Sequence, residues 1–173
     1  MKLQQPNMRP QDVVILLKII TYHGQEWYQI PMAEDLYMSQ SEISQSIARS
    51  KFAGLLDSSG KKVRTIAFME FLQYGISYVF PQQPGAIVRG IPTGHSAAPL
   101  AGIMQSQESY VWPTGKGKAR GQSIVPLYPS VIEAALKDEK LYELLVLVDA
   151  IRVGRAREKE IAISELKSRI LNG

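Results

Sequence analysis

The chain has 173 residues and a formal net charge of +4 at pH 7, with 45% hydrophobic and 21% charged residues. This is the composition of an ordinary globular protein of one domain or two small ones, long enough to bury a substantial core. It contains no cysteine, which excludes a disulfide framework, a cysteine-based zinc site and a thiol nucleophile. No run of about 18 apolar residues and no apolar signal-peptide core is present, so we expect a cytoplasmic protein that does not span a membrane.

The excess of positive charge lies mainly in the middle of the chain. Residues 1–75 carry eight Lys and Arg against seven Asp and Glu, residues 76–130 four against one, and residues 131–173 eight against eight. A modest basic bias suits contact with the phosphates of a nucleic acid, although many unrelated proteins share it.

The first predicted helix opens at Arg9-Pro10-Gln11-Asp12 and runs to about His23. Proline is favourable near a helix start, where its missing N–H has no intrahelical partner to lose. Apolar residues face almost all directions of this helix, which predicts that it is buried. Trp27 and Tyr28 follow and are expected to cover the edge of the core.

Residues 29–56 are predicted to form two short helices joined by a tight turn. Ser39-Gln40-Ser41-Glu42 has capping-box spacing, in which the serine hydroxyl and the glutamate carboxylate each satisfy a free backbone N–H at the helix start. Ile43 and Ile47 give the second helix a buried stripe, and Gly54 ends it. The first helix has an apolar face made of Ile30, Met32, Ala33 and Leu36.

Polar side chains are expected on the outer face of the second helix. In a helix-turn-helix unit this helix lies in the major groove. Amides pair bidentately with adenine, arginine pairs with guanine, and serine bonds to bases or phosphates. Together with the N-cap residue, the candidate DNA-binding side chains are Ser39, Gln40, Ser41, Ser44, Gln45, Arg49 and Lys51.

This segment resembles the helix-turn-helix of winged-helix bacterial transcriptional regulators of the MarR-like or ArsR-like kind. In those families a small residue in the first helix is followed by an apolar pair around the turn, a Ser-x-x-Val-Ser pattern and a final Ala/Gly-Leu-Leu. The matching positions here are Ala33, Leu36, Met38, Ser41, Ile43, Ser44, Ile47 and Ala53-Gly54-Leu55-Leu56. The resemblance covers roughly residues 9–65 and implies an autoregulating repressor. Tyr37 stands at the turn position where those families usually have glycine.

The segment after Leu56 is short for a two-stranded wing, so a reduced wing is expected. Its cations Lys61, Lys62 and Arg64 either contact phosphates or form a solvated basic turn. Residues 65–80 have apolar side chains at helical spacing and predict a core helix that leads into the second half of the chain.

Residues 81–129 contain seven of the ten prolines and seven of the thirteen glycines, with large apolar residues interspersed. We interpret them as ordered, extended chain with one β-hairpin, in which residues 109–112 pair with residues 122–127. The loop between these strands is rich in glycine and is suited to reach a phosphate backbone through its cations, Lys116, Lys118 and Arg120.

Enzymatic motifs are poorly supported. The glycine-rich loop lacks the spacing of a P-loop, and no helix opens directly after it. His95 and Ser96 are adjacent in sequence, and adjacent side chains rarely face each other as a base and a nucleophile do. The chain has only two histidines, with no carboxylate cluster near either, so we expect no metal, no cofactor and no enzymatic activity.

The last third of the chain is predicted to be helical. Ser130-Val131-Ile132-Glu133 is a second capping box and starts a short helix. Residues 141–151 are apolar over most of the helix circumference, and residues 155–171 continue with a further helix. One packed helix needs only one apolar face, so the surplus around residues 141–151 predicts a homodimer held by these C-terminal helices.

The expected protein is mainly α, with a winged-helix-type domain over residues 1–80. Residues 81–173 would serve dimerisation or partner binding. The expected function is sequence-specific binding of double-stranded DNA. The alternative is a protein-interaction module without specific DNA binding, for example the antitoxin-like partner of a toxin encoded in the same operon.

Overall fold

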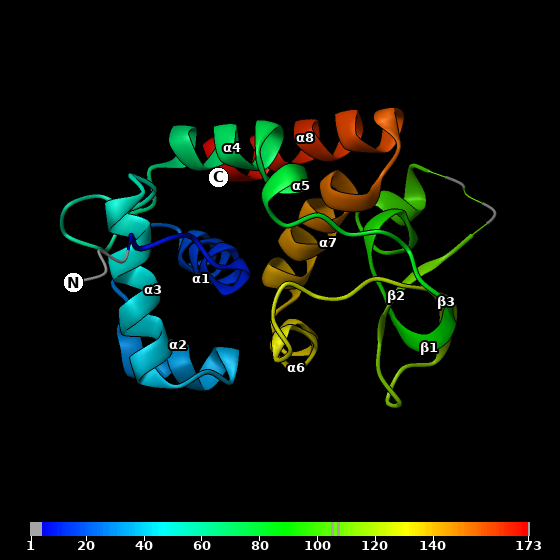
Figure 1. Cartoon of the computed structure of the whole chain (residues 1–173), viewed down its shortest axis with the longest axis horizontal. Helices are drawn as coiled ribbons and strands as arrows, with labels where there is room; N and C mark the ends of the chain where they lie inside the picture. The colour runs from blue at the N-terminus through cyan, green and yellow to red at the C-terminus, as the bar shows by residue number, and fades with distance from the viewer. Residues whose placement is uncertain (1–4, 105, 107, 173) are drawn as a thin grey trace.

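The computed structural model of the protein describes residues 5–104, 106 and 108–172. The described chain is mainly α-helical with one small sheet, as predicted. Figure 1 shows the first three helices at one end of the long axis and the strands at the other. The elements in chain order are α1 (Pro10–Thr21), α2 (Gln29–Leu36), α3 (Gln40–Phe52), α4 (Thr65–Tyr74), α5 (Ile76–Val79), β1 (Ile87–Pro92), the 3-10 turns η1 (Gly94–Ser96) and η2 (Leu100–Gly102), β2 (Tyr110–Pro113), β3 (Ala119–Ser123), α6 (Val131–Leu136), α7 (Glu139–Val153) and α8 (Ala156–Leu171).

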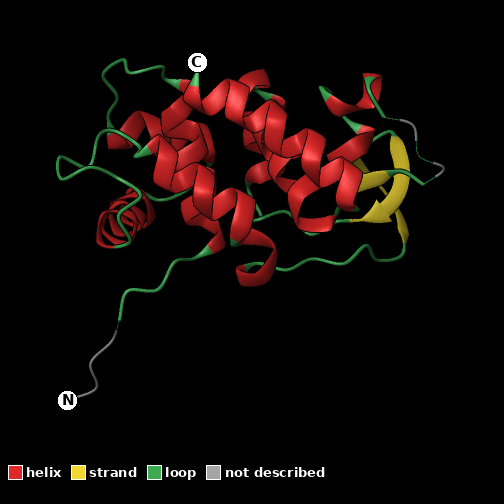
Figure 2. Ribbon diagram, turned by 90° about the horizontal axis from the view of Figure 1, so that it is seen from above, coloured by secondary structure: helices red, strands yellow, loops and turns green. Residues whose placement is uncertain are grey.

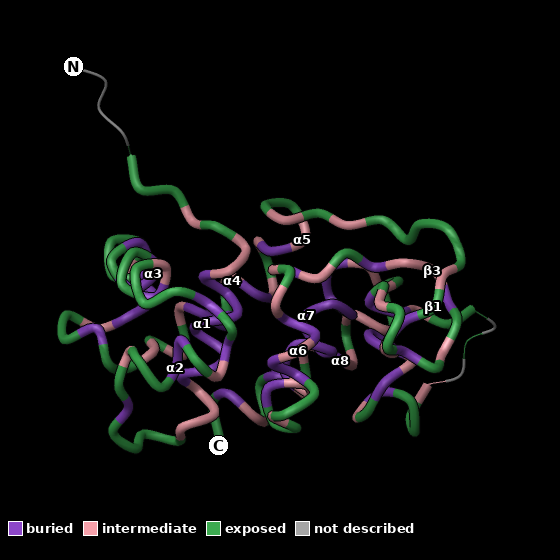
Figure 3. Tube along the Cα trace, turned by 90° about the horizontal axis from the view of Figure 1, so that it is seen from below, coloured by how far each residue is buried: buried purple, intermediate pink, exposed green. Residues whose placement is uncertain are grey.

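Helix α7 lies at the centre of the molecule and is buried along most of its length (Figure 3). It packs against α8, α6, α1, α5, α4 and η1. In the apolar run 141–151, from which the dimer was predicted, Leu144, Val146, Leu147 and Val148 are 4%, 0%, 0% and 0% exposed within the single chain. The surplus of apolar side chains on α7 is therefore used inside the monomer and gives no support to a dimer through this helix.

Helix α1 is buried on all sides, as predicted, and joins the N-terminal helices to α7 in one hydrophobic core. Lys18 is buried on this helix, and its ammonium donates a hydrogen bond to the carboxylate of Asp138 at 2.7 Å. Asp138 is also the N-cap of α7 and accepts from the backbone N–H of Leu141. This shared carboxylate fixes α1 against the start of α7.

The second predicted capping box does not form. The Ser130 hydroxyl instead donates to the backbone carbonyl of Leu36 at 2.6 Å, which ties the start of α6 to the end of α2. A serine at a helix start thus satisfies a free carbonyl of another helix, a use that local spacing does not reveal.

The turn between α2 and α3 has the expected position, with a tyrosine at its left-handed residue. Tyr37 adopts φ 54° and ψ 41°, and the ammonium of Lys137 lies 4.8 Å from its ring centre. Ser39 caps α3 as predicted by accepting from the backbone N–H of Glu42 at 3.1 Å, but the reciprocal bond of the predicted capping box does not form, because the Glu42 carboxylate bonds Gln11 and Arg49 instead. Gly54 follows the helix at φ 78°, and the hydrogen bonds from Gly54 to Lys51 and from Leu55 to Ser50 form a Schellman motif.

A tight hairpin, residues 55–64, connects α3 to α4. Leu56 and Val63 form a single antiparallel bridge, flanked by backbone hydrogen bonds from Asp57 to Lys62 and from Arg64 to Leu55. The Asp57 carboxylate accepts from the Ser59 hydroxyl and from two backbone N–H groups of the turn, and these bonds lower its pKa. We call this segment hairpin 55–64; it is as short as the sequence indicated.

The sheet differs from the predicted hairpin. Figure 2 shows its three strands gathered at one end of the molecule. β1, which was not assigned from sequence, pairs antiparallel with both β2 and β3, whereas β2 and β3 pair with each other in parallel. A Cβ on Gly90 would lie 2.0 Å from the Trp112 carbonyl oxygen, and one on Gly117 2.1 Å from that of Gly90. Only glycine permits these close backbone approaches, which depend on a strand distant in sequence.

Within the described part of the chain, no helix is long and apolar enough to cross a membrane.

Candidate nucleic-acid interface

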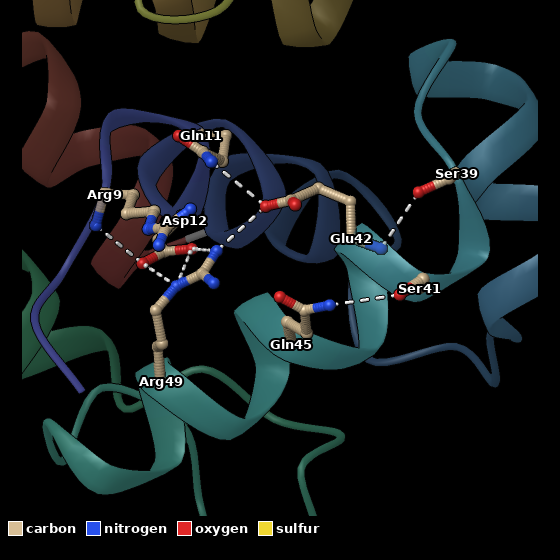
Figure 4. A network of polar contacts seen from close by, with 8 residues as sticks. All are labelled: Arg9, Gln11, Asp12, Ser39, Ser41, Glu42, Gln45 and Arg49. Atoms are coloured by element: carbon tan, nitrogen blue, oxygen red, sulfur yellow. Dashed lines mark hydrogen bonds and ion pairs between the residues drawn. The ribbon is translucent and has the colours of Figure 1, made fainter. Parts of the chain in front are cut away.

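Arg49 does not lie on the outer face of α3, where the sequence placed it. It is 8% exposed and turned towards α1, where its Nη2 and Nε atoms bond Asp12 at 2.8 and 3.0 Å. The same Nη2 bonds Glu42 Oε1 at 2.9 Å, and that oxygen also accepts from the Gln11 amide at 3.0 Å. Figure 4 shows these side chains converging between the two helices.

In this network the positive charge of Arg49 is paired with the carboxylates of Asp12 and Glu42. Asp12 is 0% exposed and also accepts from the backbone N–H of Arg9 at 2.8 Å. The hydrogen bond to Asp12 raises the pKa of the Arg49 guanidinium, against the effect of burial, and Glu42 adds to the rise. Charge-assisted, bidentate pairs of this kind fix orientation as well as position. Arg49 therefore holds α3 on α1 instead of contacting a ligand.

Glu42 makes this network sensitive to acid. Burial pushes the pKa of its carboxyl up, but hydrogen bonds from Gln11 and Arg49 outweigh burial and lower it below the ordinary value of about 4.3. A lowered folded-state pKa stabilises the fold above the unfolded-state pKa, and this contribution is lost as the pH falls through the folded value. Between about pH 5 and pH 3, the free energy of unfolding should fall further for the wild-type protein than for the Glu42→Gln variant. Parallel urea curves at each pH measure this, and equal losses would contradict it.

The other predicted side chains of α3 are exposed. They are Ser39, Gln40, Ser41, Ser44, Gln45 and Lys51. The Gln45 amide nitrogen donates to the Ser41 hydroxyl, one turn earlier, at 3.0 Å. Two further exposed residues of α3 were not among the predicted site residues: Ala48, and Phe52 at the end of the helix, which is 72% exposed. We call Gln40, Ser41, Ser44, Gln45, Ala48 and Lys51 the exposed face of α3.

Hairpin 55–64 packs beside the C-terminal half of α3. A Cβ on Gly60 would lie 3.2 Å from the Ile47 side chain and 3.4 Å from that of Lys51. Lys62 and Arg64 are exposed on this hairpin. The fold therefore brings these two cations to the same region as Lys51.

The Lys61 side chain makes contacts within the fold. Its ammonium bonds the backbone carbonyl of Trp27 at 2.6 Å and lies 4.4 Å from the centre of the Trp27 indole. The Lys61 carbonyl in turn accepts from the indole N–H at 2.9 Å. This cation therefore anchors hairpin 55–64 to the segment before α2.

The glycine-rich loop is not brought together with α3. It belongs to the strand region, at the opposite end of the long axis (Figure 1). Lys116 pairs with Glu133 of α6 at 2.8 Å, which raises the Lys116 pKa, while Lys118 and Arg120 are exposed. The predicted site residues thus divide into one group at α3 and hairpin 55–64 and a second, separate group on this loop.

A second buried polar cluster joins the strand region to α7 and was not found from sequence. Asp149 is 2% exposed and accepts from the Thr93 hydroxyl and the Trp112 indole N–H, both at 2.7 Å. Burial raises the pKa of the Asp149 carboxyl, while the nearby Arg152 guanidinium, at 3.0 Å, opposes that rise. Arg152 also donates to the backbone carbonyl of Phe80. The contacts of Asp149 with Thr93 and Trp112, and that of Arg152 with Phe80, each link α7 to another part of the fold, so we interpret the cluster as structural.

His95 and Ser96 have separate partners. The His95 ring bonds the backbone carbonyl of Glu108, and the Ser96 hydroxyl accepts from the backbone N–H of Tyr110 at 2.8 Å. This geometry does not orient the two side chains as a base and a nucleophile, which would have to be hydrogen-bonded to each other.

Comparison with known proteins found no matching family model, no matching curated protein and no matching solved structure. Functional interpretation therefore depends on the residues and geometry of this chain.

Proposed function

We propose that the protein is a sequence-specific DNA-binding transcriptional regulator, an autoregulating repressor, that inserts α3 into the major groove. The observation that carries this proposal is the exposed face of α3, which combines amides and hydroxyls with a firmly held backbone. The Arg49 network fixes the helix from its inner side, so the outer side chains are presented on a rigid element.

The surroundings of α3 suit a duplex. Hairpin 55–64 acts as a short wing, with Lys62 and Arg64 exposed beside Lys51. Cations in these positions bind phosphates and set the register of the helix, whereas amides and hydroxyls contact the base edges.

Salt dependence of DNA binding tests this assignment. Replacing Lys51, Lys62 and Arg64 with glutamine should weaken binding to all duplexes. It should also flatten the plot of log affinity against log salt by roughly one unit for each phosphate that is no longer neutralised. The matched control replaces Lys116, Lys118 and Arg120, which carry the same formal charge on the glycine-rich loop. A titration in increasing salt, followed by gel shift or fluorescence anisotropy, measures both variants.

Three outcomes can be distinguished. A flattened slope in the first variant with an unchanged slope in the control supports the surface formed by α3 and hairpin 55–64. If only the control flattens the slope, the duplex lies on the glycine-rich loop instead. If wild type binds its own upstream DNA no better than a shuffled duplex, the proposed function is wrong.

A protein-interaction module is the second candidate function, and one observation favours it. Helices α4 and α5 carry four large, exposed apolar side chains: Ile66, Tyr74, Tyr78 and Val79 are 71%, 69%, 83% and 52% exposed. Where such side chains gather into a patch, they are typical of protein-binding surfaces. A partner encoded in the same operon would be recovered with wild type and lost with Tyr74→Ser and Tyr78→Ser, while both variants would keep DNA binding under the first proposal.

A further inference from the structure

The exposed face of α3 lacks the side chain that reads guanine most strongly. All residues of α3 are described, and its two cations are Arg49 and Lys51. Arg49 is engaged by Asp12 and Glu42 on the inner side, and Lys51 lies in the last turn. Between its start and Lys51, the exposed residues of α3 are therefore amides, hydroxyls and Ala48.

The side-chain amide of Gln45 already makes one hydrogen bond within α3. Its Nε2 atom carries two hydrogens, one of which is donated to Ser41 Oγ at 3.0 Å (Figure 4). The second N–H and the amide oxygen are not engaged by Ser41. Adenine presents a matching acceptor at N7 and donor at N6 in the major groove.

Guanine does not match this arrangement. It presents two acceptors, N7 and O6, so the amide oxygen would face another acceptor without a proton between them. An arginine would match guanine through its two parallel N–H groups, but the guanidinium of α3 is withdrawn into the protein.

We propose that Gln45 reads one adenine in the major groove, that Ser41 is the residue that positions the Gln45 amide, and that Arg49 contacts no base. This inference rests on the proposed function, because it assumes that α3 enters the groove. It adds the identity of the base and of the residue that selects it.

Selection of duplexes from a randomised library tests the assignment. With wild type we expect enriched duplexes in which one position in each site is adenine, preferred over guanine by roughly 5- to 150-fold. Gln45→Ala should abolish the preference at that position only. Gln45→Glu should replace adenine by cytosine there, since a carboxylate accepts from the cytosine N4 amino group and has no donor for N7.

Ser41 is tested at the same position. Ser41→Ala should reduce the preference for adenine and leave the other enriched positions unchanged, and Ser41→Thr, which keeps the hydroxyl, should restore it. A merely structural role of Ser41 would alter overall affinity or thermal stability instead, so melting curves accompany each selection. Both side chains are exposed, and we expect unchanged melting temperatures.

The outcomes separate this inference from the proposed function. If wild type enriches no duplex, the proposed function fails and the inference fails with it. If wild type enriches a motif that Gln45→Ala and Gln45→Glu leave unchanged, or a motif with guanine at the Gln45-dependent position, the base assignment alone is overturned. An Arg49→Lys variant that loses one guanine from the motif while melting normally would likewise overturn it.

Discussion

Replacing Arg49 with alanine is expected to lower the free energy of unfolding by about 3–5 kcal/mol, the usual effect of breaking a buried ion pair. The loss is large because the substitution leaves the Asp12 carboxylate, which is 0% exposed, without its guanidinium partner. Folded domains are stable by only about 5–15 kcal/mol, so this variant should denature at much lower urea concentration.

Lys51→Ala is the matched control, because it removes a cation from an exposed position two residues later on the same helix. It should change stability by no more than about 0.5 kcal/mol. Asp12→Ala should be strongly destabilising as well, and the double variant should lose less than the sum of the two single losses. Urea denaturation of the four proteins gives the coupling free energy; additive losses, or an Arg49→Ala variant as stable as wild type, would contradict the network.

The position of Arg49 could not be predicted from the sequence pattern, because the buried side of α3 is partly polar. Ser46 and Ser50 are 0% and 1% exposed, and they lie on the inner side with Glu42 and Arg49. Helical periodicity identifies a buried face by its apolar residues, and on α3 only Ile43 and Ile47 mark that face in the sequence. The partner of Arg49 is 37 residues away on another helix, so local spacing contains no sign of the pair.

Helix ends were more predictable than strand pairing, for a related reason. Ser39 and Gly54 act through backbone groups within a few residues, and the structure has both as expected. The pairing of β1 with β2 and β3 depends on glycines that meet distant backbone, such as Gly90 at the Trp112 carbonyl. Ser130 failed as a cap for the same reason, since its partner is Leu36 on a distant helix.

The two carboxylates of a Leu144→Asp, Val148→Asp variant are expected to unfold the chain. Both wild-type side chains lie in the hydrophobic core that α7 shares with its neighbours, at 4% and 0% exposure. Burying a charge there without a partner costs several kcal/mol per group, and two such groups consume most of the stability of a domain of this size. Circular dichroism should show lost helix content at neutral pH, while Lys140→Asp, on the exposed start of the same helix, should leave the spectrum and the melting temperature nearly unchanged.

A milder variant distinguishes a core helix from a dimer interface. Leu144→Ala should lower the free energy of unfolding by about 2–5 kcal/mol, as large-to-small substitutions in a packed core do. Because the side chain is buried within one chain, this loss should not depend on protein concentration, and the mass measured by sedimentation should equal that of wild type. If the variant with both aspartates stayed folded and had half the mass of a dimeric wild-type protein, α7 would instead be the dimer interface. A homodimer that reads two half-sites about 34 Å apart remains compatible with the proposed function, but it must form through a surface other than α7.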